Sequence, residues 1–230
     1  MAKTTVSTIT ADLKAIIDYD ITDTELDTLI LKHLNYAVKR MKKWFLNEGY
    51  FDEIGASDSF STTANQEYID IATETIDFDQ PIVLTERTND NPITLVSFKE
   101  YRERFPDPSI DKSATPDIAA FFANRLYLGP TPSGVITIYS DYVKTITKMT
   151  SSSSLPYEDE YDELVSAIVV EKLVAWFDRK DRAAIVTARE EVKMLKDELI
   201  VMPARNIGMN QQVQSRREER PYFSPKKVIN

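Results

Sequence analysis

The sequence predicts an α+β fold: a helical-bundle body (about 8–47 and 156–200) with an inserted β unit and an extended C-terminal arm. Apolar residues recur at helical spacing towards both ends of the chain, which is typical of helices with a buried face. Between them lie short runs rich in β-branched and aromatic residues, which favour strands. The final segment, 203–230, follows neither period.

The first helical region contains a short helix at 8–17 and a longer one that begins after Thr22. Thr22 and Glu25 have the spacing of a capping box. Apolar residues then recur at steps of three and four as far as Phe45, so one face of this helix should be buried. We expect the helix to end between Asn47 and Gly49.

The middle of the chain predicts short, mostly antiparallel strands. Seven of the eleven prolines lie between Pro81 and Pro132, which keeps the elements there short. The expected elements are a hairpin of 60–63 with 67–73, a strand at 81–85, a helix at 95–104, a hairpin of 118–122 with 125–128, and a strand at 135–143.

Two further helices are predicted at 156–177 and 181–199. Pro156 suits a first helical turn, and the acidic residues after it suit the positive end of the helix dipole. Apolar residues cover more than one face of the first of these helices, so it should be buried on two sides. The second has a narrow stripe suited to helix packing. The helices at 23–47, 156–177 and 181–199 should pack together.

The last segment, 203–230, is predicted to be a docking arm. It has six Lys and Arg against two Asp and Glu, three prolines, and no periodic apolar face, so it cannot offset the entropy of ordering itself. We therefore expect it to bind a neighbouring subunit or another partner. The expected binding residues are Arg205, Ile207, Met209, Arg216, Arg217, Arg220, Tyr222, Phe223, Lys226 and Lys227.

The expected domains follow from this order of elements. They are a helical body at 1–50 and 150–202, a β-rich subdomain at 51–149, and the arm at 203–230.

Composition excludes several classes of function. The net charge is −9, and residues 1–202 carry 22 Lys and Arg against 35 Asp and Glu. Such an acidic body argues against tight nucleic-acid binding, although DNA could pass it without sticking. The absence of cysteine excludes disulfides, thiolate nucleophiles and cysteine–zinc sites. No apolar run approaches the ~20 residues of a membrane span, so we expect a protein made in a cytoplasm without a membrane partner.

No motif predicts catalysis, a metal or a cofactor. His33 is the single histidine and reads best as a packing or surface residue. Asp159 and Glu163 stand four residues apart on one helical face and, with Glu158, could be metal ligands. The simpler interpretation is that these acidic residues stabilise the start of a helix. Phosphate-binding loops and nucleophile elbows are absent from the sequence.

Two aromatic pairs are open to two interpretations. Trp44 with Phe45, and Trp176 with Phe177, lie near the ends of expected helices. They can be core residues, or they can lie at a subunit interface, where aromatic side chains are enriched.

The order of these elements resembles that of the head-to-tail adaptor (connector) proteins of tailed bacteriophages, over about residues 8–200. The matching segments are 22–47, Phe60-Ser61-Thr62, Tyr68-Ile69-Asp70-Ile71, Thr115-Pro116-Asp117, the segment 126–132 leading into Ile138-Tyr139, and Leu155-Pro156. The arm falls outside the resemblance.

The resemblance implies a structural, non-enzymatic virion protein of the neck. Such adaptors form a ring, usually of twelve copies, between the portal protein and the tail or neck proteins, and DNA passes through the channel without sequence-specific binding. Their C-terminal extensions often reach the portal or a neighbouring subunit. An acidic channel would repel DNA phosphates and let the DNA move.

Three alternatives remain open at this stage. The first is another phage neck or tail component, such as a stopper or tail-completion protein. The second is a carboxylate metalloenzyme that uses Glu158, Asp159 and Glu163. The third is a nucleic-acid-binding module that uses the basic arm.

Overall fold

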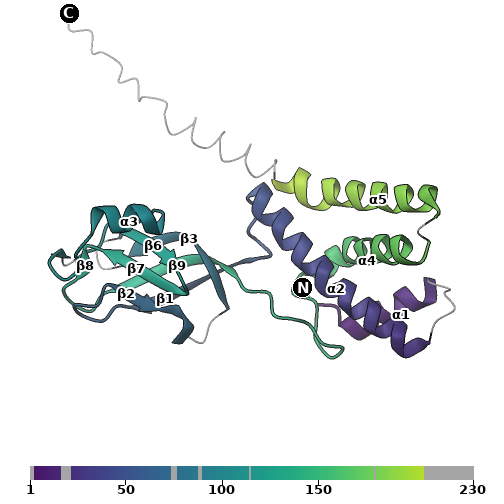
Figure 1. The fold of residues 1–230 in the computed structure, drawn as a ribbon, viewed down its shortest axis with the longest axis horizontal. Helices are drawn as coiled ribbons and strands as arrows, with labels where there is room; N and C mark the ends of the chain where they lie inside the picture. The colour runs from purple at the N-terminus through teal and green to yellow at the C-terminus, as the bar shows by residue number, and fades with distance from the viewer. Residues whose placement is uncertain are drawn as a thin grey trace, which may run out of the picture. The chain divides into compact units, whose positions relative to one another are not determined.

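The chain divides into a helical unit and a β unit (Figure 1). The computed structural model describes residues 3–16, 22–73, 77–87, 90–113, 115–178 and 180–204. Met1–Tyr50 and Lys148–Asn230 make up the helical unit, and Phe51–Thr147 the β unit. The described residues form five α-helices and a seven-stranded mixed sheet, which confirms the α+β class.

The helical unit is built around a central helix, α4. Its α-helices are α1 (Val6–Ile16), α2 (Asp23–Glu48), α4 (Asp162–Phe177) and α5 (Arg182–Lys196), which continues into a π-helical turn, η3 (Asp197–Val201). α4 packs on α1, α2 and α5. This contact on several sides explains why its apolar residues surround the helix instead of forming one stripe. The expected packing of the three long helices is confirmed.

The ends of α2 follow the sequence signals. The Glu25 backbone N–H donates to the Thr22 hydroxyl, and the Thr22 backbone N–H donates to the Glu25 carboxylate, which completes the capping box. Gly49 ends the helix in the left-handed region at φ 66°, where glycine has no Cβ penalty. Both predictions are confirmed.

The start of α4 differs from its prediction. The α-helix begins at Asp162, six residues after Pro156, and is preceded by a 3₁₀ turn, η2 (Asp159–Tyr161). The lead-in buries Tyr157 and Tyr161 against Phe45, each ring centroid 5.3 Å from that of Phe45. Burying two aromatic rings stabilises this segment more than an early helical turn would.

The β unit contains a curled seven-stranded sheet, a two-stranded sheet and a short helix. Its elements are β1 (Gly55–Ser61), β2 (Tyr68–Asp70), η1 (Ile71–Thr73), β3 (Phe78–Glu86), β4 (Asn91–Leu95), α3 (Phe98–Arg104), β5 (Lys112–Ser113), β6 (Ile118–Phe122), β7 (Arg125–Gly129), β8 (Thr131–Pro132) and β9 (Thr137–Lys144). The strand order is β1-β9-β3-β4-β6-β7-β2, in which β4–β6 is the parallel pair, and β5 pairs separately with β8.

One predicted hairpin is wrong and the other is confirmed. β1 pairs with β9, and β2 pairs with β7, so 60–63 and 67–73 do not pair with each other. The turn signal at Asn65 is real, since φ there is 61°, but its N–H donates to the Pro132 carbonyl. β6 and β7 form the second hairpin, with positive φ at Ala123 and Asn124, as a two-residue type I′ turn requires.

The core of the β unit is one cluster of buried side chains, most of them from the seven-stranded sheet. Side chains from β1, β2, β3, β4, β6, β7 and β9 meet in this cluster. Ten of its eleven buried members have purely hydrocarbon side chains. Tyr142 is the remaining member, and its ring stacks on Phe78 with the centroids 4.7 Å apart. Long-range pairing of distant strands therefore holds this unit together.

Candidate interaction surfaces

The predicted arm residues cannot be placed. All ten, from Arg205 to Lys227, lie outside the described residues. The segment that leads to them is well anchored: Ile200 and Val201 are buried, and η3 packs on α2. Pro203 and Ala204, the first two residues of the predicted arm, continue the helical turn.

The two aromatic pairs have different roles. Phe45 is completely buried in the core of the helical unit. Trp44 lies against Arg40, 4.7 Å from the ring centroid, and against Lys196, 5.6 Å from it. Trp176 is 50% exposed. The core interpretation therefore holds for Phe45, whereas Trp176 is available at the surface.

Trp176 and Phe177 line a groove between the start of α2 and the end of α4. Its volume is about 460 Å³, and its other lining residues are Thr24, Glu25, Thr28 and Leu29. An exposed tryptophan beside an apolar groove is typical of a protein contact surface.

A buried carboxylate, Glu171, links three helices. Arg40 on α2 donates a charged hydrogen bond to it, Lys172 lies 3.4 Å away, and Arg189 on α5 lies 3.8 Å away. Burial raises the pKa of Glu171, but the hydrogen bond and charge of Arg40, with Lys172, outweigh this, so the pKa is lowered overall. The ionised carboxylate is therefore held among three cations.

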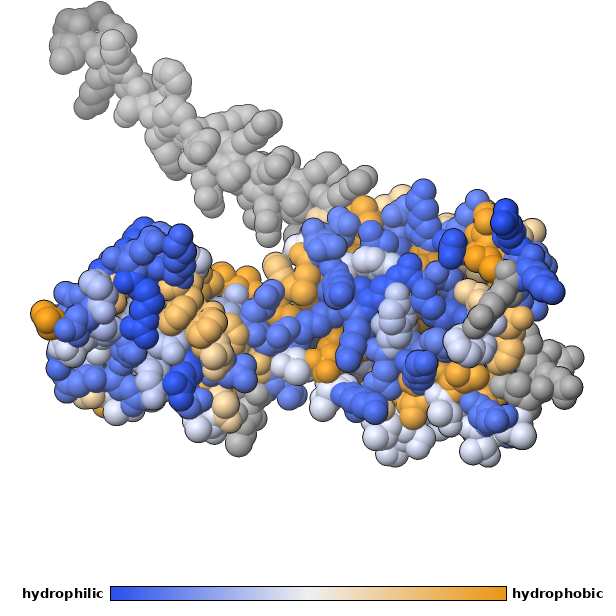
Figure 2. Space-filling view, viewed as in Figure 1, coloured by the Kyte–Doolittle hydropathy of each residue, from blue (hydrophilic) through white to orange (hydrophobic). Residues whose placement is uncertain are grey.

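Charge is distributed unevenly between segments. Residues 51–147 contain 16 Asp and Glu against 7 Lys and Arg, whereas 28–47 contains five Lys and Arg and no acidic residue. On the face drawn in Figure 2, hydrophilic residues cover much of the visible surface, with apolar residues in separate patches. The acidity expected of the whole body is thus concentrated in the β unit.

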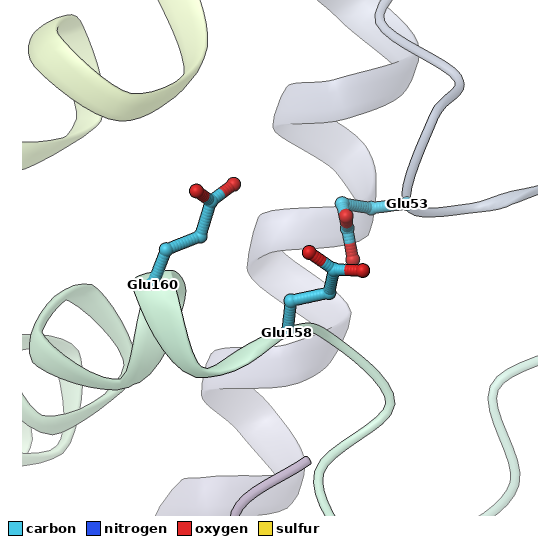
Figure 3. Close-up of side chains that lie close together, drawn as sticks. All are labelled: Glu53, Glu158 and Glu160. Carbon is cyan, nitrogen blue, oxygen red and sulfur yellow. The ribbon is translucent and has the colours of Figure 1, made fainter. Parts of the chain in front are cut away.

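The acidic segment before α4 does not form a metal centre within the helical unit. Figure 3 shows the carboxylates of Glu158 and Glu160, which leave the segment that leads into α4. Glu53, also labelled there, belongs to the β unit. Among the described residues of the helical unit, Asp159 and Glu163 belong to no group of three potential ligands.

His33 lies half-buried on α2. Burial lowers the pKa of its imidazole, and Lys32 and Lys172 lower it further. Its Nε2 has no hydrogen-bond partner among the residues that the structure describes. A neutral imidazole beside two lysines agrees with the predicted packing or surface role.

Arg102 fastens α3 to the sheet, which the sequence did not reveal. Its guanidinium makes two hydrogen bonds to Glu67, of 3.1 and 3.2 Å, and lies 5.2–5.6 Å from the rings of Phe98, Tyr101 and Tyr127. Tyr101 is completely buried, which raises its pKa to about 12, and its hydroxyl donates to the Leu128 carbonyl. This cluster is a structural clamp.

Comparison with known families decides the identity of this fold. The model of the SU10 adaptor protein family matches residues 4–216, which include every described helix and strand. The chain belongs to the SU10 adaptor protein family. The resemblance to phage head-to-tail adaptors is therefore confirmed. No curated protein matches the chain.

The SU10 adaptor match extends further than the predicted resemblance. It reaches Arg216 and so includes the first part of the arm, with Arg205, Ile207 and Met209. As a member of a phage adaptor family, the chain is a structural component of the virion that interacts with portal or tail components in general. Within the described residues, none of the helices is both long enough and apolar enough to span a bilayer.

Proposed function

We propose that this SU10 adaptor protein forms a ring in the phage neck, between the portal and the tail, through which DNA passes. The match to the adaptor family over 4–216 is the observation that carries the proposal. A ring of twelve copies is the expected size, as the resemblance implies. The role is structural, and no catalytic step is assigned to any residue.

The arm is proposed to be the docking element of this ring. It carries six Lys and Arg against two Asp and Glu, and the rest of the chain carries the opposite net charge. Charge complementarity of this kind favours contact with an acidic neighbour. Ile200 and Val201, just before the arm, are buried in the helical unit. A partner that binds the arm would therefore also be attached to the helical unit.

DNA passage is proposed to depend on the acidic surface of the chain. The β unit has more than twice as many acidic as basic residues. Acidic side chains facing a channel would repel phosphates, so the DNA would not be trapped.

The ring can be tested with purified protein, alone and with portal protein. Native mass spectrometry and two-dimensional electron-microscopy classes should show closed rings, in which the number of copies can be counted. Adaptors of this kind can stay monomeric until they meet the portal, so a monomer in isolation is not decisive. Compact monomers in the presence of portal protein would contradict the proposal.

A further inference from the structure

The helical unit has a basic face formed by α2, α4 and α5. It consists of Lys32, Lys39 and Lys43 on α2, Lys172 on α4, and Arg189 and Lys193 on α5. Contacts join the three helices there: Lys172 Nζ lies 4.9 Å from the Tyr36 ring centroid, and Arg189 and Arg40 both approach Glu171. The buried carboxylate of Glu171 thus lies among cations from all three helices.

The α2 side of the basic face has no acidic partner among the residues that the structure describes. Lys32, Tyr36, Lys39 and Lys43 recur at steps of four, three and four, which places them on one exposed helical stripe. The three lysines make no ion pair with any described residue. Their charge is therefore not neutralised by the described part of the chain.

An acidic face lies at the start of α4 and on α1. It consists of Asp12 on α1 with Glu158, Asp159, Glu160 and Glu163. α1 and η2 both pack on α4, which brings Asp12 and Asp159 towards Asp162. Burial raises the pKa of Asp162, and the charges of these two carboxylates raise it further. Asp12, Asp159, Glu160 and Glu163 are exposed or nearly so, which leaves a concentration of negative charge at the surface.

The two faces use different parts of the helical unit: the acidic face lies at the start of α4 and on α1, whereas the basic face uses Lys172, ten residues after Asp162 on α4, together with α2 and α5. α1 packs on α2 and α4, whereas α5 packs on α4 (Figure 1). Figure 1 shows α4 between α5 and α1. A copy that offers its basic face to the acidic face of the next copy leaves its own acidic face for a third, which is a head-to-tail contact that can close into a ring.

We propose that neighbouring copies dock by placing the basic face of one helical unit on the acidic face of the next. This inference rests on the proposed ring, because it names the contact that would build it. The occupant of the basic face is thus a second copy of this chain. The long-range attraction of the two faces would set the order and register of the copies.

A protein partner fits the basic face better than DNA does. Tyr36 is 45% exposed, and Val186, three residues before Arg189 on α5, is 49% exposed. Apolar side chains among the charges can be buried against a protein surface, whereas a phosphate backbone offers them little. The same helical unit also supplies an acidic face.

Charge reversal on each face tests the contact. Lys39→Glu with Lys43→Glu reverses the basic face, and Asp12→Lys with Glu163→Lys reverses the acidic face. Each double variant alone should associate about tenfold more weakly or worse in sedimentation velocity at low salt. A 1:1 mixture should regain association, because each reversed face then meets a face of opposite charge on the other variant.

Controls separate this result from misfolding and from simple changes in net charge. Lys99→Glu with Lys112→Glu makes the same charge change on the β unit and should leave association unchanged. Circular dichroism and melting temperature establish that each variant is folded, and higher salt should narrow the difference between wild type and the reversed variants.

The outcomes distinguish the contact from the ring. The inference would be overturned if rings still formed with both charge reversals, or if the 1:1 mixture associated no better than either variant alone. Neither result would contradict the proposed ring. Open chains that respond to the reversals would support the contact and contradict the closed ring. Loss of duplex DNA binding by Lys39→Glu with Lys43→Glu, with association unchanged, would assign the face to DNA instead. A wild type that never associates, even with portal protein, would overturn both.

Discussion

At the scale of single residues, Glu171 shows how one buried charge organises the helical unit. Its side chain is 7% exposed and meets Arg40, Lys172 and Arg189 from three helices. A buried carboxylate is tolerable only because it is paired and hydrogen-bonded. The same arrangement leaves a surplus of positive charge at the surface above it.

We predict that Glu171→Gln destabilises the protein by about 1.5–3 kcal/mol at pH 7, the usual contribution of a hydrogen bond to a charged group. The pKa of the folded carboxyl is lowered, so its stabilisation is present above its ordinary value of 4.5 and is lost as the pH falls towards the folded pKa. Urea unfolding of wild type and variant from pH 7 to pH 3 measures the difference.

A constant difference between wild type and Glu171→Gln across that range would show that the carboxyl does not titrate as argued. The matched control is Glu190→Gln on α5, an exposed carboxyl with no ion pair among the described residues. Its effect on the free energy of unfolding should stay within about 0.5 kcal/mol at every pH.

At the scale of elements, α2 carries the strongest local signals in the chain. Its capping box, apolar stripe and closing glycine were all readable from the sequence because each depends on residues within one or two turns. Its buried face supports α4, so fraying at its start would be transmitted to the groove lined by Trp176 and Phe177.

We predict that Thr22→Ala lowers the free energy of unfolding by about 1 kcal/mol, because it leaves the Glu25 N–H without its side-chain acceptor. Thr28→Ala is the matched control: its hydroxyl donates to the Thr24 carbonyl inside the helix and supplies no cap. Thermal and urea unfolding should separate the two variants. Equal losses would mean that the box does not stabilise the helix start.

At the scale of the whole molecule, the charges of separate segments matter more than the total. A net charge of −9 conceals an acidic β unit, a basic stretch at 28–47 and a basic arm. Segments of opposite sign on one chain allow copies to attract each other without a large apolar interface.

We predict that removing residues 205–230 leaves the fold intact and abolishes docking. No described element contains these residues, so the helical circular dichroism signal should persist and the melting temperature should change little. Co-sedimentation with portal protein should be lost. A collapse of the helical signal would show instead that the arm is part of the fold.

Alanine replacement of Arg216, Arg217 and Arg220 in the full chain refines that test. If charge drives docking, this variant should bind more weakly and with less dependence on salt than the wild type. Unchanged binding would indicate that docking depends on the apolar residues Tyr222 and Phe223 instead.

Local chemistry explains which elements could be predicted. The type I′ turn at Ala123-Asn124 lies between two runs that pair directly, so that hairpin was predictable. Asn65 also adopts a positive φ, but it leads into strands whose partners, β9 and β7, lie far along the chain. A turn residue predicts that the chain reverses there, but it does not specify which strands the flanking segments pair with.

The candidate surfaces were predictable only in part. The aromatic pairs were visible in the sequence, but only packing separates the buried Phe45 from the half-exposed Trp176. The acidic run at 158–163 and the lysines of α2 can be read in the sequence, but only the fold brings Asp12 to the first and Lys172 and Arg189 to the second. The residues proposed for the arm stay a prediction, since they lie outside the described residues.

The sequence by itself determined the α+β class, the order of the helices, the caps of α2 and the resemblance to phage adaptors, because these depend on local periodicity and on the order of motifs. Only the tertiary structure decided the strand order, the burial of Glu171 among three cations and the placing of Lys172 beside Tyr36. These features depend on contacts between residues far apart in the chain. The entropy lost in closing such long loops is offset by tertiary packing, which local sequence patterns do not encode.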